Sequence, residues 1–318
     1  MTRSLFLFLA FANGAFAGVT VSLAAEKAEF VIKDERVVGL SGLAWCREDL
    51  YYAASDRLQG FVPVRLTVDG VTGLITAGKV ETPVPVKTGF SDFEDIVCDA
   101  KGGKVYLSAE GPPGIAGFTL AGKPLPAVKL PPVFLTARPN LSMEALTRDA
   151  ATGHVWTANE DTLPGDGETA SRKAPGVVRL QEFDAGWKPL RQYAWRTETS
   201  SLRVSGSGTG VPALCILPDG NLLVLERVFA GFSMEVHISL ADFSGATDTS
   251  KIAALTGVAY TPAKKVPLFK KNTSLTNYEG MALGPSLKDG SRSLVLVADS
   301  GNATDHRFMA LKVQTAKR

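Results

Sequence analysis

The sequence predicts an all-β protein, a single β-propeller built of four-stranded blades. Three observations support this prediction: helical periodicity is nearly absent after the first residues, short β-like runs alternate with turns, and one unit recurs along the chain. The turns are rich in Asp and Gly, as in DAKGG (99–103) and DAATG (149–153), which supplies the positive φ that tight hairpins need. With 45% hydrophobic and 21% charged residues, the 318-residue chain has the composition of a folded domain.

The recurring unit is a short strand, a turn, a stronger strand and an acid at the far end. Its five copies cover 41–56, 93–110, 143–160, 212–226 and 278–299. The aligned opening positions hold Gly42, Glu94, Glu144, Ala213 and Glu279. Successive openings lie 52, 50, 69 and 66 residues apart. A period near 50 with several strands per unit is typical of a propeller, whereas a pair of β-sandwiches does not explain it.

Further β-like runs complete the blades. FVPVRLTV (61–68) and LITAGKVETP (74–83) are the expected third and fourth strands of the first blade. In the fourth blade, 232–240 and 250–255 take these places. The last unit has one further run, 306–313, and EFVIKDERVV (29–38) is expected to pair with it, which closes the ring and removes exposed edges. Five blades are counted, and the segments 180–212 and 255–278 leave room for a sixth, degenerate blade.

Residues 1–25 are predicted to be a secretory signal peptide. A basic start, MTR, precedes the apolar stretch 4–17, and small residues favour cleavage after Ala17 or Ala25. No stretch reaches the ~18 unbroken apolar residues that a membrane span needs. We therefore expect an exported chain, periplasmic or secreted, whose mature domain (26–318) has no integral membrane segment and is a monomer. The net charge of +2 gives no support for a nucleic-acid partner.

The chain contains three cysteines, Cys46, Cys98 and Cys215. An odd number in an exported protein leaves at least one cysteine unpaired or bridged to another chain. Cys46 and Cys98 share one offset in two repeats, which permits a disulfide between them. Three buried free thiols are the equally open alternative.

Three of the opening positions predict a cation site. The innermost strand of each blade lines the central channel of a propeller, so Glu94, Glu144 and Glu279 are expected to approach one axis. Like charges brought together need a bound cation or nearby Arg and Lys. Oxygen ligands in this number favour Ca²⁺, and Asn140 and Asn277 are further candidate oxygen donors.

The closing acids are expected at the same rim, because the end of the second strand lies beside the opening of the first. They are Asp56, Glu110, Glu160, Glu226 and Asp299. Arginine follows two of them, as Arg57 and Arg227. We predict that Glu226 or Asp299 acts as a general base and that Arg57 or Arg227 binds a negative charge on the substrate.

Other catalytic chemistries find little support. No G-x-S-x-G motif is present, and none of the three histidines, His154, His237 and His306, lies near a serine in a triad-like context. SGSGTG (205–210) has no following lysine, so it is interpreted as a flexible connection rather than a phosphate loop.

Five motifs give the chain a resemblance to a known family. They are DFED (92–95), NLSMEAL (140–146), LPDGNLLVLERVF (217–229), NYEGMA (277–282) and LVLVADSGN (294–302). Together they resemble the exported bacterial proteins with a phytase-like domain, labelled "esterase-like activity of phytase", over residues 37–313. The chain departs from the family pattern at the first and fourth openings, where Gly42 and Ala213 stand in place of an acid.

The resemblance implies a propeller, export, and hydrolysis of a phosphate or carboxylic ester aided by Ca²⁺. The polar positions that match the family motifs are Glu94, Glu144, Glu226, Arg227, Glu279, Asp299 and Asn302, and Asn302 joins the two arginines as a candidate substrate-binding residue. The expected partner is a small anionic or ester substrate. A non-catalytic binding propeller with structural Ca²⁺ and a lactone hydrolase are the alternatives.

Overall fold

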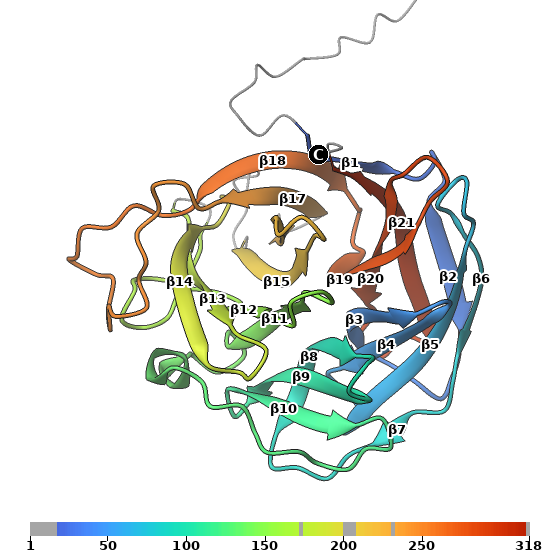
Figure 1. The fold of residues 1–318 in the computed structure, drawn as a ribbon, viewed down its shortest axis with the longest axis horizontal. Helices are drawn as coiled ribbons and strands as arrows, with labels where there is room; N and C mark the ends of the chain where they lie inside the picture. The colour runs from blue at the N-terminus through green and yellow to red at the C-terminus, as the bar shows by residue number, and fades with distance from the viewer. Residues whose placement is uncertain (1–17, 172–173, 200–207, 230–232, 316–318) are drawn as a thin grey trace, which may run out of the picture.

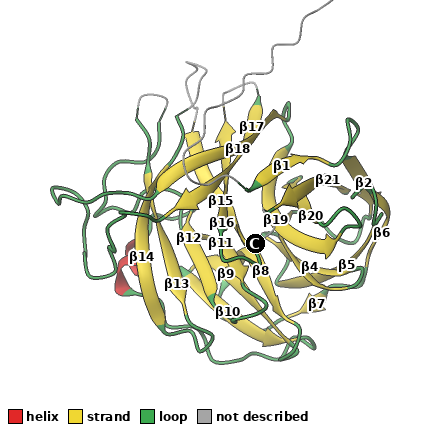
Figure 2. Cartoon of the chain, turned by 45° about the horizontal axis from the view of Figure 1, so that its top comes forward, coloured by secondary structure: helices red, strands yellow, loops and turns green. Residues whose placement is uncertain are grey.

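The computed structural model describes residues 18–171, 174–199, 208–229 and 233–315, which form five antiparallel sheets arranged in a ring around a central axis (Figure 1). Strands make up nearly all of the regular structure, and the described part of the chain has a single helical turn, η1 (Pro132–Thr136) (Figure 2). No described helix is long and apolar enough to cross a membrane. The predicted five-bladed propeller is confirmed, while residues 1–17 of the predicted signal peptide lie outside the described residues.

The blades follow one another along the chain, each starting with its innermost strand. Blade one contains β3 (Leu40–Arg47), β4 (Leu50–Ser55), β5 (Gly60–Val68) and β6 (Ile75–Val80), with β7 (Val84–Pro85) also on β5. Blade two contains β8 (Ser91–Asp99), β9 (Lys104–Gly111) and β10 (Gly114–Thr119). Blade three contains β11 (Met143–Arg148), β12 (Val155–Asn159), β13 (Val177–Phe183) and β14 (Pro189–Arg196). Blade four contains β15 (Gly208–Ile216), β16 (Leu222–Phe229), β17 (Met234–Asp242) and β18 (Lys264–Asn272).

Blade five closes the ring with strands from both ends of the described chain. It contains β19 (Asn277–Ser286), β20 (Arg292–Asp299) and β21 (Asp305–Gln314), and β2 (Glu29–Lys33) pairs with β21 as predicted, with Phe30 opposite Phe308. A further strand, β1 (Thr20–Leu23), pairs with the end of β21 and places Val21 opposite Val313. Figure 1 shows these blue strands beside the red β21. Cleavage after Ala17 would retain β1, whereas cleavage after Ala25 would remove it.

Two details differ from the predicted blades. The outer strand of blade four is β18, not residues 250–255, and β18 carries Lys264, Lys265, Lys270 and Lys271 along a sheet edge. Lysines on an edge strand oppose pairing with another chain. Blade two has three named strands, and its outer position holds only the isolated bridge between Phe118 and Pro124. The segments considered for a sixth blade supply β14 and β18 instead, and the described residues form no sixth sheet.

Apolar side chains between neighbouring blades hold the ring together. Phe61 of blade one and Phe93 of blade two belong to one buried cluster. Trp156 and Trp195 of blade three form another with Val224 of blade four. Burial of such large side chains at these junctions stabilises the ring.

A disulfide between Cys46 and Cys98 adds a covalent link between β3 and β8, with the two Cα atoms 5.5 Å apart. Cys215 is a buried free thiol. The structure thus favours the disulfide over three free cysteines.

Candidate functional site

A β-bulge lies near the start of every innermost strand. The pairing register shifts between Leu40 and Leu43, Phe93 and Ile96, Met143 and Leu146, Gly210 and Ala213, and Tyr278 and Gly280. A bulge redirects side chains at the end of a ladder. The first residue inside the bulges is Ser41, Glu94, Glu144, Val211 and Glu279 in chain order. The three glutamates are therefore equivalent in structure, but their counterparts in blades one and four are Ser41 and Val211 rather than Gly42 and Ala213.

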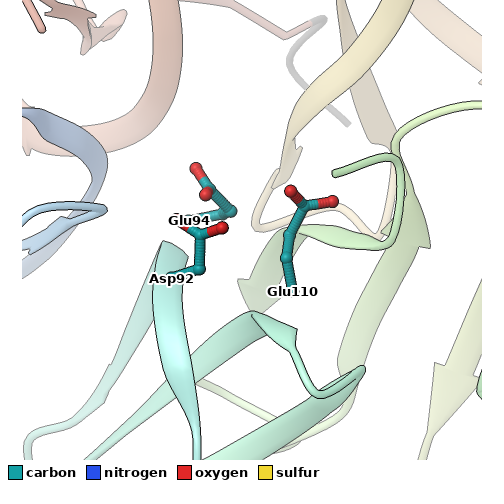
Figure 3. A group of neighbouring side chains, drawn as sticks. All are labelled: Asp92, Glu94 and Glu110. Carbon is teal, nitrogen blue, oxygen red and sulfur yellow. The ribbon is translucent and has the colours of Figure 1, made fainter. Parts of the chain in front are cut away.

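Around these bulges, side chains from all five blades form what we call the acidic mouth of the channel. Its members are Asp56, Asp92, Glu94, Glu110, Glu144, Glu160, Arg227, Glu279 and Asp299. Two sets of three carboxylates have oxygen atoms within 4.8 Å of one another: Asp92 with Glu94 and Glu110, and Glu110 with Glu144 and Glu160. Figure 3 shows the first set, with the carboxylates turned away from the ribbons of β8 and β9. Glu110 belongs to both sets and so links blades two and three.

Arg227 is the cation of the acidic mouth. Its guanidinium forms ion pairs with Glu160 of blade three and Glu279 of blade five, and its side chain is only 23% exposed. Burial raises the pKa of Glu160 and of Glu279 to about 7, although Arg227 opposes this effect. The sequence predicts Glu279 as a cation ligand together with Glu94 and Glu144, whereas the structure places it against an arginine.

The remaining carboxylates are forced together without such a partner. Burial, followed by the charges of Glu279 and Glu110, raises the pKa of Glu94 to about 10. Burial and Glu94 raise the pKa of Glu144 well above its ordinary value, and burial raises that of Glu110 to about 7. A single arginine cannot neutralise this many acids. The acidic mouth therefore has to bind protons or an added cation near neutral pH.

The rim of the mouth carries two further acids. Burial, followed by the charge of Asp299, raises the pKa of Asp56 to about 6, while Arg57 lowers it. Arg57 Nε lies 2.9 Å from Asp56 Oδ2, and the Arg57 side chain is 52% exposed. Asp299 Oδ1 accepts a 2.7 Å hydrogen bond from the Gly301 amide. Asn302 is exposed in the turn that follows β20.

Three buried oxygen atoms at or near the mouth have no hydrogen-bond partner among the described residues. They are Asn277 Oδ1, Ser142 Oγ and Asp56 Oδ1. Ser142 is fully buried, and its amide donates to Glu110 Oε1. Unsatisfied buried oxygens are rare in folded proteins, so these atoms are candidates for binding a cation or water. Asn140, the other amide considered as a donor, is exposed in a turn with φ 54°.

Glu226, predicted as a general base, lies on the other side of β16 from Arg227. Its carboxylate accepts a 2.9 Å hydrogen bond from Trp195 Nε1 and lies 2.5 Å from Lys265 Nζ. Successive side chains of a strand point to opposite faces, so adjacent residues cannot both reach the channel. Blade four thus presents Arg227 to the mouth, where the sequence pattern indicates an acid.

Asp95, which the sequence reasoning did not single out, lies below the acidic mouth. It is 1% exposed, and its carboxylate accepts 2.8 Å hydrogen bonds from the amides of Ile96 and Leu146. A hydrogen bond from the Leu43 amide adds a third donor. Asp95 thereby ties together the innermost strands of blades one, two and three. Its adjacency to Glu94 in DFED was the one available hint in the sequence.

A cavity of about 330 Å³ opens beside Arg227. Glu160, Asp161, Thr209 and Met234 line it together with Leu141, Gly210 and Phe229. A buried carboxylate and a guanidinium therefore lie next to space for a small molecule, which is the arrangement expected of a binding or catalytic site.

Comparison with known proteins identifies one family and a set of distant folds. A family model described as "Phytase-like: Esterase-like activity of phytase" matches residues 35–301. No curated protein matches the chain. An endo-arabinase from Bacteroides thetaiotaomicron is similar in structure, with 12% identity, a TM-score of 0.49, and coverage of 90% of this chain and 97% of the other. A nidogen/laminin complex has 10% identity, a TM-score of 0.42, and coverage of 95% and 100%. These structural similarities are too distant to bear on function.

Proposed function

The chain belongs to the phytase-like family, and on this basis we propose that it hydrolyses a phosphate or carboxylic ester at the acidic mouth. The observation that carries the proposal is the convergence of acids from several blades on one half-buried arginine beside a cavity. Carboxylates with strongly raised pKa values gather at functional sites, because catalysis needs proton donors and acceptors poised near the working pH.

The carboxylates and the unpaired oxygens fit a bound Ca²⁺. Glu110 would hold it, either with Asp92 and Glu94 or with Glu144 and Glu160, the two sets whose carboxylate oxygens lie within 4.8 Å of one another. The donor set consists only of oxygen, as Ca²⁺ requires, and Asn277 Oδ1 is a buried acceptor without a described partner. When bound, Ca²⁺ would supply Lewis-acid polarisation of a phosphoryl or acyl oxygen. Glu279, paired with Arg227, is left out of the ligand set proposed from the structure.

Glu160 and Arg227 are the residues of this chain best placed to act on a substrate. Both line the 330 Å³ cavity, and the Glu160 carboxyl has a pKa of about 7, which suits a proton acceptor at neutral pH. An anionic substrate group would compete with Glu160 and Glu279 for the Arg227 guanidinium. Asp299 and Arg57 remain candidates at the rim, whereas the contacts of Glu226 with Trp195 and Lys265 favour a structural role.

An activity panel tests the proposal. Phytate, p-nitrophenyl phosphate, p-nitrophenyl acetate and a sugar lactone are each assayed with Ca²⁺ and with a chelator. We expect hydrolysis of at least one phosphate or carboxylic ester, lost on chelation, and a kcat lower by about 10²–10⁴-fold in Glu160→Gln. Glu81→Gln, which changes an acid beyond the end of β6 that pairs with Lys79, is the control and should retain full activity. Full activity in both Glu160→Gln and Glu94→Gln would place the reaction elsewhere.

A non-catalytic propeller that binds a ligand is the second candidate. The closed pairing of Arg227 with Glu160 and Glu279 favours it, because a guanidinium already held by two acids is a stable structural element. Failure of all four substrates, together with a Ca²⁺-dependent rise in melting temperature, would support this candidate. Saturable turnover of the lactone alone would instead identify a lactone hydrolase.

Export is part of the proposal. It rests on the basic and apolar start of the sequence and on the disulfide between Cys46 and Cys98, a bond typical of oxidising compartments. Fractionation of cells that express the full sequence, followed by N-terminal sequencing of the protein, tests it. A protein that stays in the cytoplasm with its N-terminus uncut would contradict it.

A further inference from the structure

The opposite end of the channel holds a second cavity, of about 410 Å³, which we call the apolar mouth. All five innermost strands line it with residues that follow the acidic mouth along the chain. On β8 and β19 these are Ile96–Cys98 and Met281–Leu283, two to four residues beyond Glu94 and Glu279. At ~3.3 Å per residue, the two mouths are separated by roughly 7–13 Å along a strand. Cavities of this volume accommodate small organic ligands.

One charged side chain at the apolar mouth, Arg292, has no carboxylate partner. No ion pair within 4 Å joins Arg292 to any acid in the described part of the chain. Its Nε and Nη2 both donate to the Gly284 carbonyl, at 3.0 and 2.6 Å, and Nη1 donates to no other residue that the structure describes. Arg148, the other arginine of the lining, lies 3.5 Å from Asp99 and is thus already paired. Arg292 is therefore the cation of this cavity that no described acid compensates. The lining acid, Asp149, accepts hydrogen bonds within its own turn from the Ala151 amide and the Thr152 hydroxyl.

The surroundings of Arg292 are largely apolar. Its guanidinium lies 5.2 Å from the ring centre of Trp45, and burial lowers its pKa. Leu43, Leu283 and Ile216 line the adjoining space. A partly desolvated cation without an anion is costly, and an anion supplied by a ligand would offset that cost.

We propose that the apolar mouth binds a small apolar carboxylate, whose anionic group pairs with Arg292 and whose hydrocarbon part lies against Trp45 and the leucines of the channel. The guanidinium presents the planar donor pattern that a carboxylate accepts, and the aromatic and aliphatic lining suits a hydrocarbon chain or ring. This site shares no residue with the acidic mouth, so it is independent of the proposed hydrolysis.

Calorimetric titration of the purified protein with octanoate and with 1-octanol tests the proposal, in the presence of a chelator. The two probes share a hydrocarbon chain and differ in charge. We expect octanoate to bind with a 1:1 stoichiometry and at least about 10-fold more tightly than octanol, because a charge-assisted hydrogen bond is lost with the alcohol. Equal affinities, or no saturable binding of octanoate, would overturn the proposal.

Variants locate the binding. Arg292→Met should weaken the affinity for octanoate at least about 10-fold and leave that for octanol unchanged. Arg307→Met, on the third strand of blade five, β21, should change neither affinity. Retained octanoate affinity in a folded Arg292→Met variant would overturn the assignment. Should Arg292→Met not fold, Trp45 serves in its place: octanoate should alter the tryptophan fluorescence of the parent but not of Trp45→Phe. An unaltered response in Trp45→Phe would count against the site.

Discussion

The two mouths of the channel are built on the same five strands and have opposite chemistry. At the acidic mouth, carboxylates lie together and are opposed by Arg227, with the exposed Arg57 paired to Asp56 at the rim. At the apolar mouth, aliphatic side chains surround Arg292, which lacks an acidic partner in the described structure. A strand only a few residues long can therefore carry two unlike sites. The difference shows that the propeller repeat fixes where side chains converge, while the residue types at each level decide what they can bind.

Asp95 separates the two mouths, and its removal should have the largest effect on stability. Asp95→Ala leaves the amides of Ile96, Leu146 and Leu43 without their buried acceptor. We expect a loss of about 3–5 kcal/mol in the free energy of unfolding, measured by urea denaturation. Asp69→Ala is the control, because Asp69 accepts amides in an exposed turn and its loss should cost clearly less. A loss of similar size in both variants would show that Asp95 does not hold the strands together.

Because of the crowded acids at the acidic mouth, the free energy of unfolding should fall as pH rises. The pKa of Glu110 is about 7 in the folded protein and near 4.5 when unfolded, so the folded state binds more protons between these values. Stability from this group is complete below about pH 4.5 and is lost as pH rises through 7. Glu110→Gln removes this titrating group. Between pH 5 and pH 8, measured with a chelator present, the free energy of unfolding of the variant should therefore rise relative to that of the parent by about 2 kcal/mol, after allowance for partial exposure.

Glu81→Gln is the matched control for that measurement. The hydrogen bond from Lys79 lowers the pKa of Glu81, so the variant should lose stability relative to the parent as pH rises above about 4. The two substitutions therefore have opposite signs in the same urea titrations. A Glu110→Gln variant that follows the pattern of Glu81→Gln would contradict the crowding of acids at this mouth.

The disulfide between Cys46 and Cys98 links two strands at the apolar mouth, and Cys98 lines the cavity. Replacing both cysteines with serine should lower the free energy of unfolding by about 2–4 kcal/mol, because the cross-link restricts the unfolded chain. A reductant should lower the free energy of unfolding of the parent to that of the variant and leave the variant's own value unchanged. An unchanged urea midpoint in a parent with fully reduced thiols would rule out this contribution.

Strand β1 touches neither mouth, so its loss should have the smallest effect. A protein that starts at Glu26 lacks the pairing of β1 with β21 and the burial of Val19 and Val21. Compared with a protein that starts at Gly18, it should be less stable by about 1–2 kcal/mol in urea, with unchanged octanoate binding. A larger loss, or altered binding, would indicate that β1 supports the channel itself.

The repeat predicted most of the fold, since innermost strands, turns and ring closure follow from hydrophobic pattern and period. The outer strand β18 was missed because KKVPLFKKN is rich in lysine and carries a proline, features of an exposed edge rather than of a buried strand. Blade number was left open because insertions lengthened the last two intervals, which pattern alone does not distinguish from a degenerate blade.

The candidate site was predicted in its position but not in its pairings. The approach of Glu94, Glu144 and Glu279 to one axis follows from their equal place in the repeat, and the structure brings all three to the mouth. Arg227 points to the mouth and pairs with Glu279, whereas the adjacent Glu226 points away and contacts Trp195. This difference depends on which face of β16 each of the two side chains occupies. The bulges shift the alternation of the innermost strands by one residue relative to their partner strands, and a bulge has no simple sequence pattern.

The ring closure by β2 and β21 also has a consequence for how the protein folds. The hydroxyl of Tyr278 donates to Glu29, 249 residues away in sequence, and the last blade cannot be completed before β21 exists. Contacts at such separation slow folding, because a long loop must close before they form. Until then β21 has an open edge that other chains could pair with. Kinetic competition between ring closure and aggregation should therefore set the yield of refolded protein, and dilution should favour closure.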